Sequence, residues 1–183
     1  MTEISDRYRR LADLFAATVA AVPEDQWGKP SPCEGWTARD VLRHVVDNHT
    51  LFYSFIGRTI PEGPSVDDDP VGAIEHVKAA MGRDLEDPAT AGTEYDGVFG
   101  KRTFEWAVDQ FLSGDLVLHR WDLGTAAGLE VEIPVDDIDR AWKDTEFYGE
   151  MARQPGVFGP ELDPPAGADE QTKLLAFTGR RAW

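Results

Sequence analysis

The chain has 183 residues, of which 42% are hydrophobic, and it carries a formal net charge of −16 at pH 7. This length and composition predict a single globular domain over residues 1–183 with a sizeable core of its own. The acidic balance argues against nucleic acid and against anionic membrane surfaces as partners, because both require clustered Lys and Arg. Cys33 is the only cysteine, so an internal disulfide and a cysteine-rich zinc site are excluded.

The sequence contains no membrane or export signal. No apolar stretch approaches the roughly 18–20 residues that span a bilayer, and the N-terminal segment lacks the continuous apolar region of a secretory signal. We therefore expect a cytoplasmic protein whose partner is a small-molecule substrate. Helical bundles often associate through exposed faces, so a homodimer is compatible with the sequence, although no apolar stripe marks such a face.

Hydrophobic periodicity predicts three helices in the first half of the chain. The first covers about residues 3–21 and ends before Pro23. Thr37 and Asp40 form a capping-box pattern that opens a second helix running to about Gly57. A loop rich in Pro, Gly and Asp follows, after which Asp69-Pro70 opens a third helix over about 71–86.

The second half of the chain continues the helical pattern after an interruption. Glycines and Pro88 predict a long loop over residues 88–101. The best-defined helix covers about 103–127, and Gly128 ends it. Further helices are predicted at about 135–152 and 169–179. The fold class is therefore all-α, with a helical bundle and additional short helices as the expected architecture.

Asp115 and His119 are the main clue to function. They stand four residues apart in the helix predicted over 103–127, so both side chains lie on one helix face. Apolar side chains share that face and direct it toward a core: Val108, Leu112, Leu116, Leu123 and Ala126. A carboxylate in such a stripe is costly unless it is paired or binds a metal ion. The pair is therefore a candidate chelator of one divalent cation.

A third ligand would have to come from another helix, and His44 is the best candidate. His49 also lies near an apolar arc of the same helix, so periodicity does not decide between the two. Two imidazoles and one carboxylate leave coordination positions open, and they suit zinc, nickel, iron or manganese far better than calcium. The alternatives are that Asp115 pairs with a buried arginine and that His119 is a hydrogen-bonded core histidine.

Three further residues have two interpretations each. Asp122 follows His119 by three residues and is either another ligand or, as we favour, a group that orients His119 or an arginine. Asp40 repeats the Asp-x-x-x-His spacing before His44, but its place in the first helical turn favours a capping role. Cys33 is read as a small buried hydrophobe, with a reactive thiol near a helix N-terminus as the alternative.

Several stretches resemble a known family. The segment Trp36-Thr-Ala-Arg-Asp-Val-Leu-Arg-His44, preceded by Pro32-Cys-Glu-Gly, is similar to the first motif of the mycothiol-dependent maleylpyruvate isomerase group within the DinB-like superfamily. Asp115-Leu-Val-Leu-His-Arg-Trp-Asp-Leu123 resembles the second motif of that group. The ending Leu174-Leu-Ala-Phe-Thr-Gly-Arg-Arg-Ala-Trp183 is similar to the tail of its stand-alone, single-domain members.

The resemblance implies an up-down-down-up four-helix bundle with a divalent metal, zinc first of all, held by His44, Asp115 and His119. It also favours His44 over His49. Enzymes of this group activate a low-molecular-weight thiol such as mycothiol at the metal. The chain lacks the C-terminal domain of the two-domain isomerases and has Asp115 where they have Glu, so maleylpyruvate itself is not the expected substrate.

The function expected from these features is a metal-dependent thiol transferase or isomerase that acts on a small electrophile. The metal would bind and deprotonate the thiol, while Asp122 or a nearby arginine orients it, which makes Asp122 the candidate catalytic residue. One alternative is a non-catalytic metal- or ligand-binding bundle. Another is a plain helical scaffold in which Asp115 and His119 pair with each other.

Overall fold

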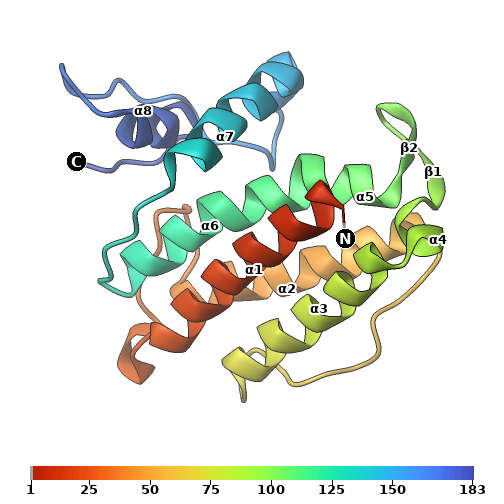
Figure 1. Cartoon of the computed structure of the whole chain (residues 1–183). Coiled ribbons are helices and arrows are strands. Elements are labelled where there is room, and N and C mark those ends of the chain that lie inside the picture. The colour runs from red at the N-terminus through yellow and green to blue at the C-terminus, as the bar shows by residue number, and fades with distance from the viewer. Residues whose placement is uncertain (1) are drawn as a thin grey trace.

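The computed structural model describes residues 2–183 as a mainly helical protein built on a four-helix bundle (Figure 1). The bundle consists of α1 (Glu3–Ala21), α2 (Ala38–Phe55), α3 (Pro70–Glu86) and a long helical run that ends with α6 (Ser113–Ala126). Helices α1 and α2 each contact both α3 and α6, so the four helices enclose one core. In Figure 1, α2 and α3 run in the direction opposite to α1 and α6, which is the expected up-down-down-up order.

Side-chain caps determine where the first helices begin. Thr37 accepts from the backbone N–H of Asp40, and the Asp40 carboxylate accepts from the backbone N–H of Thr37, which completes the predicted capping box of α2. Asp69 accepts from the backbone N–H of Gly72 at 2.8 Å, and Pro70 occupies the first turn of α3. Asp40 therefore has the capping role that its position predicts.

The helix predicted over 103–127 is interrupted by a π-helical segment. It divides into α5 (Phe104–Ala107), η2 (Val108–Leu112) and α6, and the N–H of Ser113 donates to the carbonyl of Val108. Arg7 donates to the carbonyl of Asp109 at 2.9 Å, and the Tyr148 hydroxyl donates to the carbonyl of Gln110 at 2.8 Å. These two side chains satisfy carbonyls where the α-helical pattern is broken.

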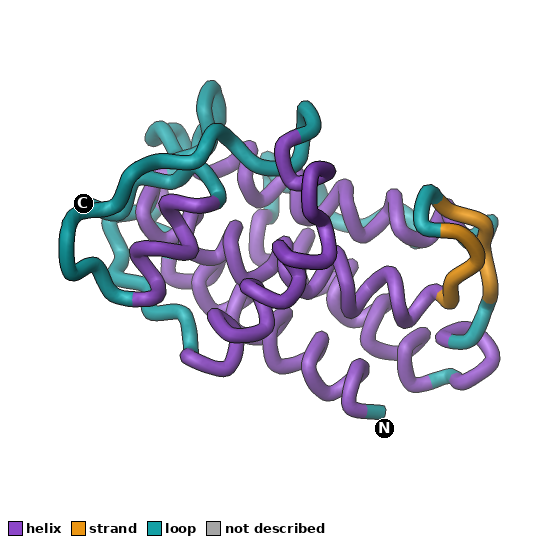
Figure 2. Tube along the Cα trace, turned by 90° about the horizontal axis from the view of Figure 1, so that it is seen from above, coloured by secondary structure: helices purple, strands orange, loops and turns teal. Residues whose placement is uncertain are grey.

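The prediction of a long loop over residues 88–101 is wrong. That region holds a short helix α4 (Pro88–Ala91) and an antiparallel hairpin of β1 (Glu94–Gly97) and β2 (Gly100–Thr103). Gly100 follows the tight turn with a φ of +78°, a conformation that glycine adopts without strain. Strands of four residues are too short to give an alternating pattern. Figure 2 shows the hairpin at one end of the molecule and the C-terminus at the other.

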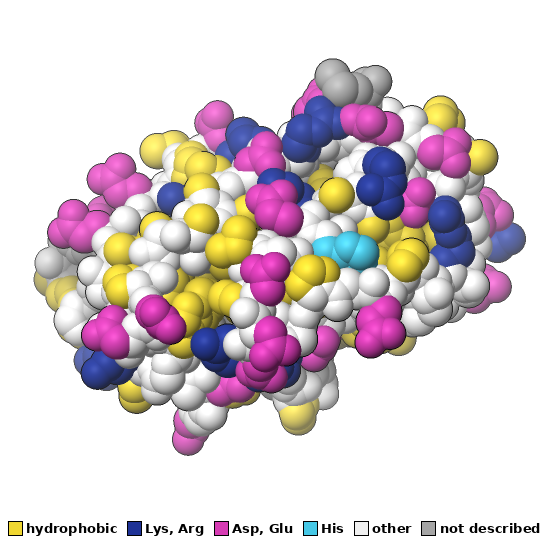
Figure 3. Space-filling view, turned by 90° about the horizontal axis from the view of Figure 1, so that it is seen from below, with side chains coloured by type: hydrophobic (Ala, Val, Ile, Leu, Met, Phe, Trp, Pro, Cys, Tyr) yellow, Lys and Arg dark blue, Asp and Glu magenta, His cyan; other side chains and the backbone are white. Residues whose placement is uncertain are grey.

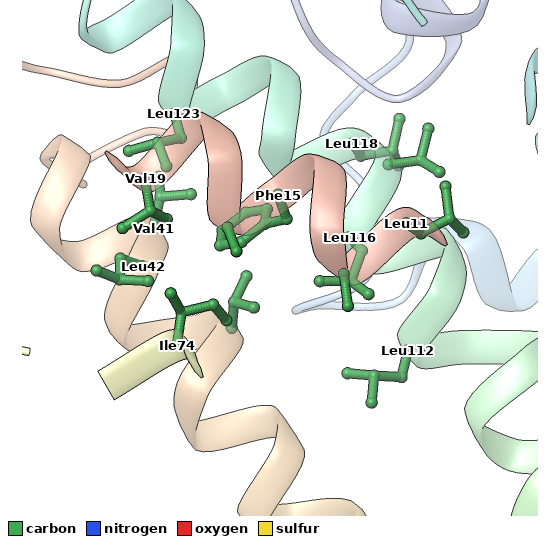
Figure 4. Close-up of a cluster of buried hydrophobic side chains, with 14 of the residues drawn as sticks. Leu11, Phe15, Val19, Val41, Leu42, Ile74, Leu112, Leu116, Leu118 and Leu123 are labelled. Atoms are coloured by element: carbon green, nitrogen blue, oxygen red, sulfur yellow. The ribbon is translucent and has the colours of Figure 1, made fainter. Parts of the chain in front are cut away.

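The core lies between the four helices and is mostly apolar, with a few buried polar side chains such as His49. Figure 4 shows side chains from α1, α2, α3, η2 and α6 converging, and these are fully or almost fully buried: Leu11, Phe15, Val19, Val41, Leu42, Ile74, Leu112, Leu116 and Leu123. Burying one such side chain stabilises the fold by about 1.5–3 kcal/mol. This core holds α2 and α6 at a fixed spacing, and those two helices carry the candidate ligands.

The last third of the chain packs beside α6 rather than extending the bundle (Figure 1). It comprises α7 (Val135–Tyr148), a 3₁₀ turn η3 (Gly149–Arg153) and α8 (Glu170–Phe177). A separate 3₁₀ turn, η1 (Glu24–Gln26), lies in the first part of the chain, directly after α1. The helix predicted over 135–152 is shorter than expected because Gly149 takes a φ of +51°. Helix α8 lies within the predicted range 169–179.

Two glycines fix the path of the segment after α8. Gly179 has a φ of +84°, and a Cβ atom at this position would lie 2.7 Å from the Cα of Gly159. The two backbones can therefore approach this closely only because neither residue has a side chain. The contact determines where the next residue, Arg180, enters the molecule.

The chain carries a net charge of −16, and on the face seen from below (Figure 3) the acidic and basic side chains are mixed. Figure 3 shows Asp and Glu side chains spread over the face seen from below, with Lys and Arg side chains between them. Within residues 2–183, none of the helices combines the length and the apolar character that crossing a membrane requires.

Candidate metal centre

Helices α2 and α6 bring His44, Asp115 and His119 together. One ligand atom from each residue lies within 4.8 Å of the other two. Nε2 of His119 is 3.1 Å from Oδ1 of Asp115, and Nε2 of His44 is 3.5 Å from Oδ2 of the same carboxylate. The i, i+4 spacing within α6 places the first pair side by side, and the packing of α2 on α6 supplies the third residue.

His49, which periodicity alone could not separate from His44, lies elsewhere. It is fully buried, its Nδ1–H donates to the carbonyl of Val45 at 2.7 Å, and its Nε2 accepts from the Tyr8 hydroxyl at 2.9 Å. Burial lowers the pKa of His49 to about 4, so the ring is neutral at physiological pH. His49 is a hydrogen-bonded core histidine.

Asp122 contacts the opposite ring nitrogen of His119. Its Oδ2 is 2.9 Å from Nδ1 of His119, and Arg180 donates to Oδ1 through Nε at 2.8 Å and to Oδ2 through Nη2 at 2.7 Å. Burial raises the pKa of Asp122, but the Arg180 charge outweighs this effect and the pKa falls to about 2. The ionised carboxylate accepts the Nδ1 proton of His119, so Nε2 is the ring nitrogen that faces Asp115.

The protonation of the cluster reflects two competing effects. Burial disfavours the charged form of His119, but Asp115 and Asp122 outweigh it and raise the pKa of His119 well above its usual value. Burial also disfavours ionised Asp115, and the two histidines outweigh it and lower the pKa of Asp115. A proton on His119 Nε2 occupies the position that a divalent cation would take. Two imidazole nitrogens and one carboxylate fit zinc, nickel, iron or manganese.

Two residues that the sequence did not single out complete the cluster. Nδ2 of Asn48 lies 3.0 Å from Oδ2 of Asp115 and 3.0 Å from Nε2 of His44. The ring centroid of Trp36 lies 4.8 Å from that of His44 and 5.9 Å from that of His119. Asn48 follows His44 by four residues, a spacing that could have identified it, whereas Trp36 comes from the loop before α2.

Cys33 lies against the same group of residues. Its Sγ is 3.2 Å from Oδ2 of Asp122, 4.0 Å from Nδ1 of His119 and 3.9 Å from Nη2 of Arg180. The side chain is half-buried and its partners are polar. Cys33 is therefore not the apolar core residue that a lone cysteine predicts.

The cluster opens into a cavity of about 720 Å³ between the bundle and the last third of the chain. His44, Asn48, Asp115 and His119 contribute polar groups to its wall. The rest of the wall is largely apolar and includes Leu51, Phe52, Phe99, Phe111, Leu118, Tyr148, Met151 and Phe158. Such a volume, apolar with a few convergent polar groups, is typical of small-molecule sites.

Comparison with known proteins agrees with this architecture. The chain is 28% identical over 175 residues to uncharacterized proteins of two Mycobacterium tuberculosis strains, CDC 1551 and H37Rv, and the alignment covers 94% of this chain and 95% of each relative. No solved structure matches significantly. The profile of the mycothiol maleylpyruvate isomerase N-terminal domain matches residues 8–94, which include His44 and Asn48 and end before Asp115. Over these residues the chain is therefore similar to the mycothiol maleylpyruvate isomerase N-terminal domains, a DinB-like family.

Proposed function

We propose that the protein binds one divalent metal ion, zinc in the first place, through His44, Asp115 and His119. With this metal it either transfers a low-molecular-weight thiol to a small electrophile or uses the thiol to isomerise that electrophile. The observation that carries this proposal is the meeting of three ligand atoms within 4.8 Å at the wall of a cavity large enough for both reactants. The family description adds mycothiol as the candidate thiol.

Each residue of the cluster has a separate task in this proposal. His119 presents Nε2 because Asp122 holds its Nδ1 proton, and Arg180 keeps Asp122 ionised. Asn48 donates to Asp115 and so orients that carboxylate. Asp122 is accordingly proposed as a positioning residue that acts through His119. A bound divalent cation supplies Lewis acidity that makes a coordinated thiol a thiolate at neutral pH.

The first test is the metal content of purified protein, measured by elemental analysis. We expect near-stoichiometric metal in the wild type and its loss in both His44→Ala and His119→Ala. His76→Ala is the matched control, since His76 lies on α3 and contacts the carbonyl of Pro61. An absence of metal in the wild type, even after reloading with zinc, nickel and manganese, would overturn the proposal.

The second test separates catalysis from simple metal binding. Metal-loaded protein is incubated with mycothiol and a set of small electrophiles, and thioether adducts or isomerised products are followed by mass spectrometry. Product amounts well above those formed by protein whose metal has been removed with a chelator would support catalytic activity. Stoichiometric metal without turnover of any thiol would instead indicate the non-catalytic metal-binding bundle that the sequence also allows.

A further inference from the structure

The cavity beside the candidate ligands changes character along its length. On α2, Phe52 lies eight residues, or about two helical turns, after His44. On the run of η2 and α6, Phe111 lies eight residues before His119. All four residues line the cavity. Because α2 and α6 run in opposite directions (Figure 1), both rings lie on the same side of the candidate ligands.

Rings from four separate segments form a connected wall on that side. Phe99 belongs to the turn between β1 and β2, and its ring centroid lies 5.5 Å from that of Phe111. The Phe111 and Tyr148 centroids are 5.8 Å apart, and those of Tyr148 and Phe158 are 5.9 Å apart. These four residues, which we call the aromatic wall, all line the cavity and are only partly buried. Apolar surface left open to water is costly, so the wall indicates an apolar ligand.

The other side of the candidate ligands is polar. Cys33 and Glu34 from the loop before α2 and Arg180 from the segment after α8 line the cavity there. Sγ of Cys33 lies 4.0 Å from Nδ1 of His119, whereas Asp115 lies beside Nε2 of the same ring. Figure 2 agrees with this separation, because the hairpin and the C-terminus lie at opposite ends of the molecule. The candidate ligands therefore stand between a polar region and the aromatic wall.

The charged groups around the cavity do not favour a negatively charged ligand at the aromatic wall. Among the described residues that line the cavity, Arg180 is the only lysine or arginine, and it already donates to both carboxylate oxygens of Asp122. Asp144 stands four residues before Tyr148 on α7 and has Arg140 as its counter-ion. A candidate metal ion would lie at the histidines rather than at the rings. An anionic group against the wall would therefore lose its hydration without gaining a partner.

We propose that the aromatic wall binds an uncharged, largely apolar molecule, preferably one with an aromatic body that packs against the four rings. Small dicarboxylates are excluded as the molecule bound there. In the proposed function this molecule is the electrophile, and its reactive atom faces the candidate ligands. That identification rests on the proposed function, whereas the binding site itself does not.

The test measures the binding of three probes by ligand-detected NMR titration, on the protein as purified and after chelation. The probes are methyl 2-naphthoate, methyl benzoate and the 2-naphthoate anion. We expect methyl 2-naphthoate to bind roughly tenfold more tightly than methyl benzoate, because its second ring buries more apolar area. After chelation it should also bind at least about tenfold more tightly than 2-naphthoate, which has the same rings and a negative charge. Equal binding in either pair, or no binding by any probe, would overturn the proposal.

Three variants locate the binding site. Phe111→Ala and Phe158→Ala are each expected to weaken the binding of methyl 2-naphthoate by roughly tenfold, because each removes one ring of the wall. Phe147→Ala is the matched control: its ring centroid lies 5.1 Å from that of Phe99, but Phe147 does not line the cavity. Phe158 lies outside the bundle, so Phe158→Ala keeps the test decisive if Phe111→Ala does not fold. Wild-type affinity in Phe158→Ala, with wild-type melting behaviour, would refute the assignment.

The comparison before and after chelation separates this inference from the metal proposal. We expect the preference for the naphthyl ester over the benzoate ester to remain after chelation, since none of the four rings is a candidate ligand. Loss of ester binding on chelation would show that the esters bind at the metal and would overturn the role of the aromatic wall. A failure to find metal, by contrast, would leave this preference unchanged and would overturn only the proposed function.

The identification of the bound molecule as the electrophile has its own measurement. Where thiol transfer is detected, Phe158→Ala should raise the KM for an uncharged aromatic electrophile several-fold and leave the KM for the thiol unchanged. A rise in the KM for the thiol alone would assign the aromatic wall to the thiol and overturn this identification.

Discussion

Two buried histidines show how strongly neighbours determine chemistry at the scale of one residue. His49 is surrounded by apolar groups, one hydroxyl and one carbonyl, and its pKa falls to about 4. His119 is also buried but lies between Asp115 and Asp122, and these carboxylates raise its pKa. The first ring is suited to packing and the second to binding a proton or a cation.

The low pKa of His49 predicts a component of acid sensitivity. Because its folded-state pKa lies below the unfolded value of about 6.5, the unfolded state binds the proton more tightly, and stability is lost as the pH falls from about 6.5 to about 4. The full effect corresponds to roughly 3 kcal/mol. Urea unfolding at pH 7 and pH 4.5 should show a smaller loss in His49→Gln than in the wild type. Identical losses in the two proteins would contradict this explanation.

Sequence reasoning predicted the three residues that the structure brings together as a candidate site, but not the residues around them. The spacing of Asp115 and His119 follows from helix geometry, so one face of one helix could be predicted. The choice of His44 over His49 required either family resemblance or coordinates, because both residues lie near the apolar arc of α2. Arg180 and Asp144 come from segments far along the chain, and only tertiary packing brings them to the cavity.

At the scale of elements, local chemistry predicted helix starts well and interruptions poorly. The caps of α2 and α3 rest on contacts between residues three positions apart, which the sequence displays directly. Carbonyls of the π-helical segment η2 accept from Arg7 and Tyr148, which are distant in sequence, and the hairpin is formed by pairing between very short strands. Neither the π-helical segment nor the hairpin produces a periodic pattern of hydrophobic residues in the sequence.

The close approach of Gly159 and Gly179 can be tested with a matched pair of substitutions. Gly156 and Gly179 have φ values of +85° and +84°, but a Cβ at Gly156 would meet nothing within 4 Å. Gly156→Ala is therefore expected to cost only about 1–2 kcal/mol for the left-handed conformation. Gly179→Ala should cost clearly more, because it also separates two backbones and displaces Arg180. Denaturant unfolding measures both, and equal losses would argue against the backbone contact.

At the scale of the whole molecule, the candidate metal links helices from opposite parts of the sequence. His44 belongs to α2, whereas Asp115 and His119 belong to α6, so a bound ion would stabilise the folded state by mass action. At a free metal concentration about 100 times Kd the gain is about 2.7 kcal/mol, or roughly 5–10 °C in Tm for a domain of this size. Chelation should lower the Tm of the wild type by that amount and leave His119→Ala unchanged. An equal shift in both would place the metal elsewhere.

The pairing of Asp122 with Arg180 has a consequence for biosynthesis. The two residues are 58 positions apart, and all four bundle helices precede the arginine in the chain. A nascent chain that has just completed α6 must therefore hold the Asp122 carboxylate without its cation until the ribosome has added the segment that follows α8. During this interval Arg180 does not yet hold the Asp122 carboxylate against His119. The nascent bundle can therefore fold around its apolar core before the candidate site is fully assembled.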